Sequence, residues 1–141
     1  MNKKIKGLKT LEKINDHKLD ELRLILSQLR AREEALQQEK TIQREREMRE
    51  KSITSNHPHL GQTLSAYMES IDLKLKAIGR EIDQINLDVE SILDEMRDLY
   101  QNGKKLESVI HQVNQEIKKE ELRQEQKIMD HLAEIRHIHS S

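Results

Sequence analysis

The histidines are the candidates in this chain for metal binding or acid–base chemistry. The sequence has seven histidines and no cysteine: His57 and His59 stand beside the single proline, whereas His131, His137 and His139 gather near the carboxyl end. A zinc site needs about four ligands that converge on a fixed frame, and two groups separated by a long helical segment do not supply one. We therefore expect exposed histidines, with no metal site and no cofactor.

Motifs for other site chemistry are missing as well. The four glycines are scattered and form neither a G-x-G-x-x-G nor a Walker phosphate loop, and no nucleophile has a recognisable setting. The formal net charge is −1, and the basic residues of the amino-terminal half alternate with acids. A nucleic-acid interface would concentrate them in a stripe. We predict neither an enzyme nor a nucleic-acid-binding protein.

The composition instead indicates long helices. Charged residues make up 36% of the 141-residue chain, and two tyrosines are its only aromatic residues. Large aromatic side chains normally fill compact cores, so their near absence argues against a globular domain. No apolar run is long enough for a signal peptide or for a membrane-spanning helix. The absence of cysteine suits a reducing compartment, and we expect a cytoplasmic protein.

A heptad pattern marks the second half of the chain. Apolar residues recur there at alternating steps of four and three, which is the pattern of a left-handed coiled coil. Gly103 is the one exception in the seam. The seam residues are Leu64, Met68, Ile71, Leu75, Ile78, Ile82, Ile85, Val89, Ile92, Met96, Leu99, Leu106, Ile110, Val113 and Ile117.

The first half carries a less regular version of the same pattern, formed by Leu22, Leu26, Leu29 and Leu36. The stretch 40–51 is mostly charged, and we interpret it as a solvated helix. Only the stretch around the single proline breaks the helical pattern, because the residue before a proline is pushed out of the helical region. We predict one coiled-coil domain over residues 1–141, with a helix at about 6–51, a turn at about 52–60 and a helix at about 60–137.

Opposite charges on the two halves favour their folding onto each other. Residues 1–51 carry a net charge of +4 and residues 52–141 a net charge of −5. Folding at the turn brings Leu36 near Ile78 and Leu29 near Ile85, so that apolar residues meet along most of the register. The predicted fold is all-α: a long two-helix antiparallel coiled-coil hairpin whose second helix is longer than the first.

The difference in length leaves part of the second helix without a partner. In the predicted register the first helix runs out opposite about residue 108, and roughly 30 residues of the second helix continue beyond it. A long single helix is not stabilised by helix propensity alone. This overhang is therefore either an element that binds a different protein or one that pairs with the overhang of a second copy.

The whole pattern resembles the FliJ/YscO family of bacterial flagellar and type III secretion proteins. The more specific resemblance lies in Glu121–Arg136, a segment rich in Glu, Arg and Gln that closes with Asp130, Ala133 and Arg136. His131 stands where an acidic residue is usual in the family. At the amino-terminal end, leucines followed by Arg23 and Arg30 resemble the family's leucine–arginine pattern.

The resemblance implies a central-stalk-like function. Members of this family insert paired helix termini into the hexameric export ATPase, promote its assembly and activity, and contact the cytoplasmic domain of the export gate and export chaperones. They work at the cytoplasmic face of the inner membrane, which they reach through these partners only. Tyr67, a large side chain off the seam, is then a candidate contact for the gate or chaperones. The implied ATPase-binding residues are Arg23, Arg30, Arg123, Gln124, Gln126, Asp130, Ala133 and Arg136.

Two other functions remain open at this point. A seam as continuous as that of the second helix also suits a homodimeric coiled-coil spacer or scaffold. A secretion chaperone that holds apolar export substrates is the third hypothesis. The stalk hypothesis predicts a monomer, whereas the scaffold hypothesis predicts a dimer.

Overall fold

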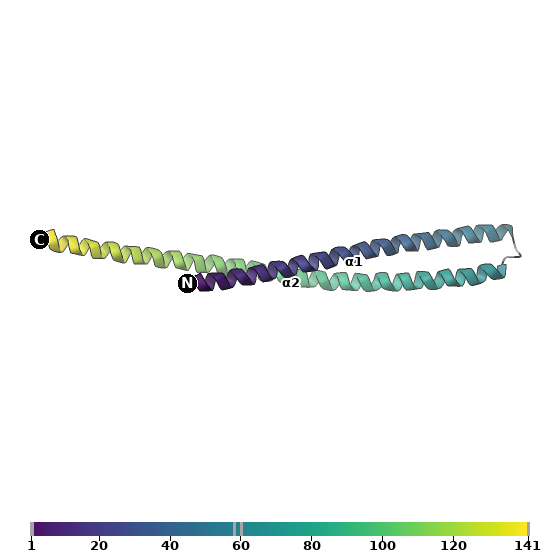
Figure 1. The fold of residues 1–141 in the computed structure, drawn as a ribbon, viewed down its shortest axis with the longest axis horizontal. Helices are drawn as coiled ribbons and strands as arrows, with labels where there is room; N and C mark the ends of the chain where they lie inside the picture. The colour runs from purple at the N-terminus through teal and green to yellow at the C-terminus, as the bar shows by residue number, and fades with distance from the viewer. Residues whose placement is uncertain (1, 58, 60, 141) are drawn as a thin grey trace. The chain divides into compact units, whose positions relative to one another are not determined.

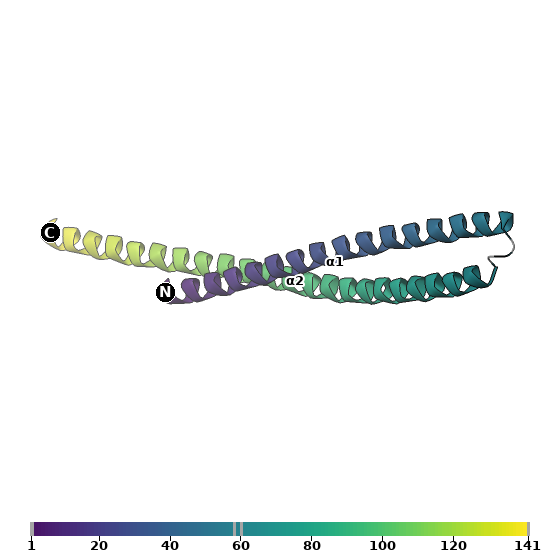
Figure 2. The same ribbon diagram turned by 45° about the vertical axis from the view of Figure 1, so that its right-hand side comes forward.

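A computed structural model describes residues 2–57, 59 and 61–140 of the chain. Over these residues the fold consists of two helices, α1 (Asn2–Asn56, 55 residues) and α2 (Gly61–Ser140, 80 residues). The two helices pack against each other as an antiparallel hairpin, and α2 is the longer one (Figures 1 and 2). The predicted fold class is confirmed.

α1 is longer at both ends than the sequence pattern predicts. It begins at Asn2 instead of residue 6 and continues through the Ser/Thr-rich stretch to Asn56 instead of ending at 51. The hydroxyl of Thr54 donates to the carbonyl of Glu50 at 2.8 Å, and that of Ser55 donates to the carbonyl of Ser52 at 2.8 Å. These bonds follow the helix and let it continue through residues that often favour turns. Pro58, the proline at which the sequence predicts a break, lies outside the described residues.

The described residues form two compact units. The turn unit comprises Asp20–Met96, and the terminal unit comprises residues 2–19 and 97–140. Each unit contains a segment of α1 and a segment of α2. α2 continues through Gly79 in the first unit and Gly103 in the second, as the sequence predicts, and none of the described glycines has a positive φ.

The core of the turn unit is aliphatic. Its fully buried cluster consists of Leu36 from α1 with Ile78, Ile82 and Ile85 from α2, and Leu29 and Val89 pack against this cluster. Each such side chain contributes about 1.5–3 kcal/mol when it is removed from water. The remaining predicted seam residues of this unit are also buried or half-buried: Leu22, Leu26, Leu64, Met68, Ile71, Leu75, Ile92 and Met96.

An ion pair between Arg32 and Glu81 joins the two helices beside this core. The guanidinium of Arg32 on α1 lies 2.9 Å from the Glu81 carboxylate on α2, and its Nε also donates to the same oxygen at 3.0 Å. Both side chains are about half exposed, so the pair contributes little to stability on its own. It does agree with the charge difference between the two halves that favoured a hairpin.

The charged stretch 40–51 of α1 belongs partly to the seam and is not simply a solvated helix. Gln43 is only 3% exposed, and Lys40, Glu47 and Glu50 are half-buried at steps of three and four. The Gln43 amide donates to the Glu39 carboxylate on the same helix at 3.0 Å. The heptad therefore continues on α1 with polar side chains whose methylene stems cover the seam.

In the terminal unit the two helices remain paired further along α2 than the sequence predicts. Leu19 and Val113 are buried, and Ile110, Ile117 and Glu120 are half-buried. The predicted overhang began at about residue 108, whereas full exposure begins at residue 121. The earlier start of α1, with Ile5 half-buried, accounts for the additional coverage.

Within the described residues, neither helix contains a stretch with both the length and the hydropathy of a membrane-spanning segment.

We expect Ile82→Ala to lower the free energy of unfolding by about 2–5 kcal/mol, because it leaves a cavity in the buried cluster of the turn unit. Urea unfolding followed by circular dichroism measures this loss. Leu87→Ala is the matched control, since Leu87 lies on the same helix but is exposed, and its effect should stay within about 0.5 kcal/mol. Equal losses in the two variants would contradict the assignment of the seam.

Candidate functional site

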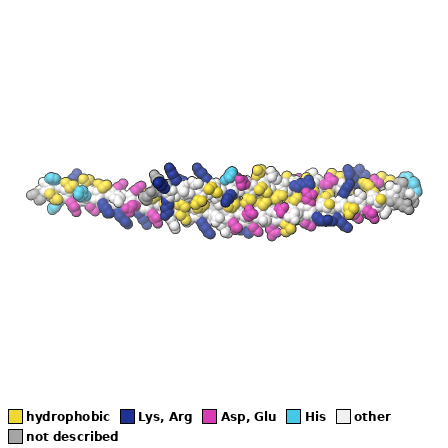
Figure 3. Space-filling view, turned by 60° about the horizontal axis from the view of Figure 1, so that its bottom comes forward, with side chains coloured by type: hydrophobic (Ala, Val, Ile, Leu, Met, Phe, Trp, Pro, Cys, Tyr) yellow, Lys and Arg dark blue, Asp and Glu magenta, His cyan; other side chains and the backbone are white. Residues whose placement is uncertain are grey.

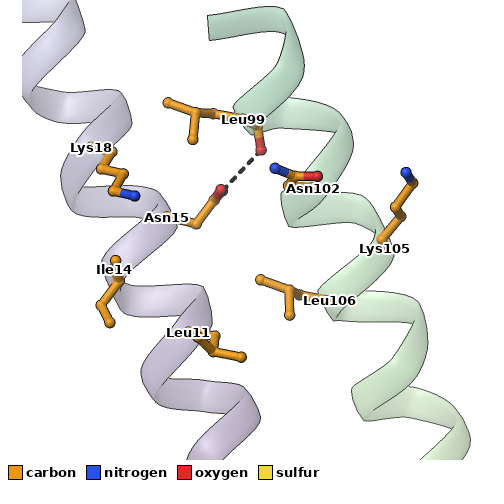
Figure 4. A pocket seen from close by; sticks show the side chains of 8 residues that line it. All are labelled: Leu11, Ile14, Asn15, Lys18, Leu99, Asn102, Lys105 and Leu106. Carbon is orange, nitrogen blue, oxygen red and sulfur yellow. Dashed lines mark hydrogen bonds between the residues drawn. The ribbon is translucent and has the colours of Figure 1, made fainter. Parts of the chain in front are cut away.

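The terminal unit contains a buried polar layer. Asn15 on α1 is 6% exposed, and its side-chain amide donates to the backbone carbonyl of Leu99 on α2 at 2.9 Å (Figure 4). Gly103 stands one turn further along α2, where an added Cβ would lie 3.0 Å from Nδ2 of Asn15. The asparagine side chain therefore occupies space that the glycine leaves open.

This layer was not recognised from the sequence, although two observations pointed to it. Asn15 lies at steps of three and four from Glu12 and Leu19, so the heptad of α1 extends through it. Gly103 is the only exception in the apolar seam of α2. Gly103 alone was noted as an exception, so the fact that Asn15 faces it was missed.

A groove adjoins this layer, and we call it the terminal groove. It has a volume of about 340 Å³ and lies between the two helix segments of the terminal unit (Figure 4). Leu11 and Ile14 remain 52% and 47% exposed in it. The lining side chains come from both helices: Leu11, Ile14, Asn15, Lys18, Leu99, Asn102, Lys105 and Leu106.

The last part of α2, residues 121–140, forms the α2 tail, and every residue in it is exposed. Several polar residues implied by the family resemblance lie here and bond along the helix. The Arg123 guanidinium lies 3.5 Å from the Glu120 carboxylate, and the Gln124 amide donates to the same carboxylate at 3.1 Å. The Gln126 amide donates to Asp130 at 3.0 Å. Exposed pairs of this kind stabilise a helix only slightly.

The helical periodicity divides the α2 tail into two opposite faces. Ile128, Leu132 and Ile135 stand at i, i+4 and i+7, and all three are exposed. Hydrophobic and histidine side chains are visible on this end segment in Figure 3 (left). The opposite face carries four of the residues implied by the resemblance; Gln124 and Arg136 lie off it. Those four are Arg123, Gln126, Asp130 and Ala133.

The structure does not bring all the implied contact residues into one described surface. Arg23 and Arg30 belong to the turn unit, whereas the α2 tail belongs to the terminal unit. Both arginines are exposed on α1, and Arg23 pairs with Asp20 at 2.9 Å. Tyr67 is 37% exposed near the start of α2. These residues keep their roles as predictions from the resemblance.

The histidines form no cluster that could hold a metal. The rings of His57 and His59 meet edge to face with centroids 5.8 Å apart. His131, His137 and His139 lie exposed on the α2 tail. Within the described part of the chain, no group of three potential metal-ligating residues comes together.

Comparison of the chain with models of protein families, with curated proteins and with solved structures returns no match. The class of protein is therefore defined by its fold, an all-α two-helix antiparallel coiled-coil hairpin with a longer second helix. The exposed faces of the terminal unit are the physical basis for any inference about function.

The polar layer predicts different outcomes for two Gly→Ala substitutions on α2. Gly79→Ala meets no atom within 4 Å, so it should raise the free energy of unfolding by up to about 1 kcal/mol through helix propensity. Gly103→Ala should gain less or destabilise, because its Cβ displaces the Asn15 amide from the Leu99 carbonyl. Urea unfolding of both variants provides the comparison.

A double-mutant cycle with Asn15→Ala tests the cause. Gly103→Ala should be more favourable by about 1 kcal/mol when residue 15 is alanine, because the two sites are in contact. Additive effects, or equal gains at both glycines, would show that the two residues do not share a layer.

Proposed function

We propose that this protein is a central-stalk-like component of a bacterial flagellar or type III protein export apparatus. In this role the helix termini insert into the hexameric export ATPase and promote its assembly and activity. The rest of the hairpin connects the ATPase to the export gate and to export chaperones. The protein acts at the cytoplasmic face of the inner membrane through these partners.

The observation that carries the proposal is the exposed α2 tail. A helical segment this exposed gains little from packing within its own chain, and isolated helices are marginal in water. An apolar stripe at i, i+4 and i+7 is the arrangement with which helices dock into grooves of partner proteins. The tail is therefore suited to binding, and the family resemblance of Glu121–Arg136 names an ATPase as the partner.

The arrangement of the chain ends supports the same function. The start of α1 and the end of α2 belong to one compact unit, which agrees with insertion of paired helix termini as the resemblance implies. The turn belongs to the other unit, together with Tyr67, the candidate contact for the gate or chaperones. Each proposed partner thus has its own part of the hairpin.

We assign most of the binding free energy to the apolar face of the tail. Residues that dominate interfaces are typically apolar or aromatic anchors that lose water completely. The polar face holds exposed pairs such as Gln126 with Asp130 that are already bonded along the helix. The polar face should therefore orient the tail in the complex more than it raises the affinity.

A chain that ends after Glu120 should lose stimulation of the purified hexameric export ATPase while keeping its hairpin. The described residues that this truncation removes are all exposed, and it retains the seam through Ile117, so the urea midpoint should stay unchanged. ATP hydrolysis rates with full-length and truncated protein measure the effect. Normal stimulation by the truncated chain would exclude the tail as the contact.

Two matched variants then separate the faces of the tail. Replacing Ile128, Leu132 and Ile135 with glutamine should weaken ATPase binding by about a hundredfold, since each anchor contributes over about 1 kcal/mol. Replacing Arg123, Gln126 and Asp130 with alanine should change the affinity for the ATPase by less than about tenfold. A larger loss of affinity in the alanine variant than in the glutamine variant would assign the contact to the polar face.

The exposed apolar stripe also permits a second function, a homodimeric spacer in which two tails pair. Sedimentation equilibrium distinguishes the two proposals. The stalk predicts a monomer mass over the accessible concentration range, whereas the spacer predicts a dimer that becomes a monomer when the same three tail residues carry glutamine.

A further inference from the structure

The terminal groove has a charge pattern that the proposed ATPase contact does not use. The residues that line it are aliphatic, amide or lysine side chains, and none of those described is acidic. Lys18 on α1 and Lys105 on α2 are both exposed and stand at the rim. Leu11 and Ile14 are about half exposed between them, so an aliphatic floor lies between cationic edges.

The α1 side of this groove repeats the spacing of a coiled-coil seam. Lys4, Gly7, Leu11, Ile14 and Lys18 follow one another at steps of three, four, three and four, and all of them are exposed. The acids of this segment stand outside this row. The row is therefore a second helical face beside the seam, with lysines at both ends and aliphatic residues between them.

The α2 side shows the complementary arrangement. Asn102, Lys105 and Val109 follow at steps of three and four, and Val109 is 39% exposed. Two such rows on neighbouring antiparallel helices flank the position that a third helix takes in a helical bundle, where axes pack 8–10 Å apart. Aliphatic side chains of that helix would meet Leu11 and Ile14.

We propose that the terminal groove is a docking site for an acidic amphipathic helix of a partner protein. Its apolar residues, spaced by three and four, cover the exposed aliphatic floor. Its carboxylates meet Lys18 and Lys105, and Lys4 extends the cationic edge. This surface is distinct from the apolar face of the α2 tail, and its occupation does not depend on the proposed ATPase contact.

The shape of the site favours a protein helix over an anionic lipid surface. Helices that bind membranes present a convex apolar face that enters the lipid headgroup region. Here the aliphatic residues lie in a groove between two helices, with the amides of Asn15 and Asn102 among the lining groups. A helix can enter such a groove, whereas a membrane surface would meet mainly its lysine edges.

Two fluorescent helical peptides with the same leucine pattern test the proposal, one flanked by glutamate and one by lysine. Fluorescence anisotropy with the full-length protein should show that the acidic peptide binds about tenfold or more tightly than the basic one. Lys18→Glu with Lys105→Glu should reverse this preference. Leu11→Gln with Ile14→Gln should weaken binding of the acidic peptide by about tenfold.

The matched controls make the same change of charge or polarity at residues that do not line the groove. Lys13→Glu with Lys104→Glu makes the same change in net charge outside the lining residues, and Leu24→Gln alters an exposed leucine of the turn unit. Both should leave acidic-peptide binding within about twofold. Equal effects of groove and control variants, or failure of the acidic peptide to bind, would overturn the proposal.

Binding to vesicles tests the other class of partner, an anionic lipid surface. Co-sedimentation with vesicles of mixed neutral and anionic phospholipid should be weak and insensitive to Lys18→Glu with Lys105→Glu. Strong co-sedimentation that this pair of substitutions abolishes would assign the groove to a lipid surface and overturn the protein-helix proposal.

Discussion

One constraint governs the fold: a continuous aliphatic stripe on α2 must be covered, and α1 is the only other described helix in the chain. α1 meets this requirement unevenly. In the turn unit it supplies Leu29 and Leu36, which form an apolar core with Ile78, Ile82 and Ile85. Nearer the turn it covers the stripe with the stems of polar side chains, including the buried Gln43. The burial of this aliphatic stripe therefore determines which face of α2 packs against α1.

The surfaces that remain after this requirement is met are the ones suited to binding. Coverage of the stripe ends at Glu120, and the helix continues beyond it with a new apolar face on residues 121–140. Beside the seam, Leu11 and Ile14 stay half exposed because they flank the stripe instead of entering it. Stability and recognition thus depend on different rows of the same helices, so substitutions in one row can leave the other intact.

The sequence predicted the hairpin because heptad spacing and opposite charge act through short-range, regular geometry. Helix ends were harder to predict, since Thr54 and Ser55 bond back into the helix instead of ending it. The reach of α1 over Val113 and Ile117 depended on its other end, the start at Asn2, and was underestimated. The partnership of Asn15 with Gly103 was missed for a different reason: it joins an exception on each helix, and only the three-dimensional register brings the two together.

That partnership has a consequence for how the hairpin can move. A slip of the helices by one heptad would place the Asn15 amide against the apolar side chain of Met96 or Ile110 and bring Leu8 or Leu22 opposite Gly103. A buried amide without a partner costs about 1–3 kcal/mol, and a single buried asparagine is known to specify register in coiled coils. The terminal unit therefore resists sliding of one helix past the other. A force applied to the α2 tail would therefore rotate or bend the paired helix segments of this unit and would not slide one along the other.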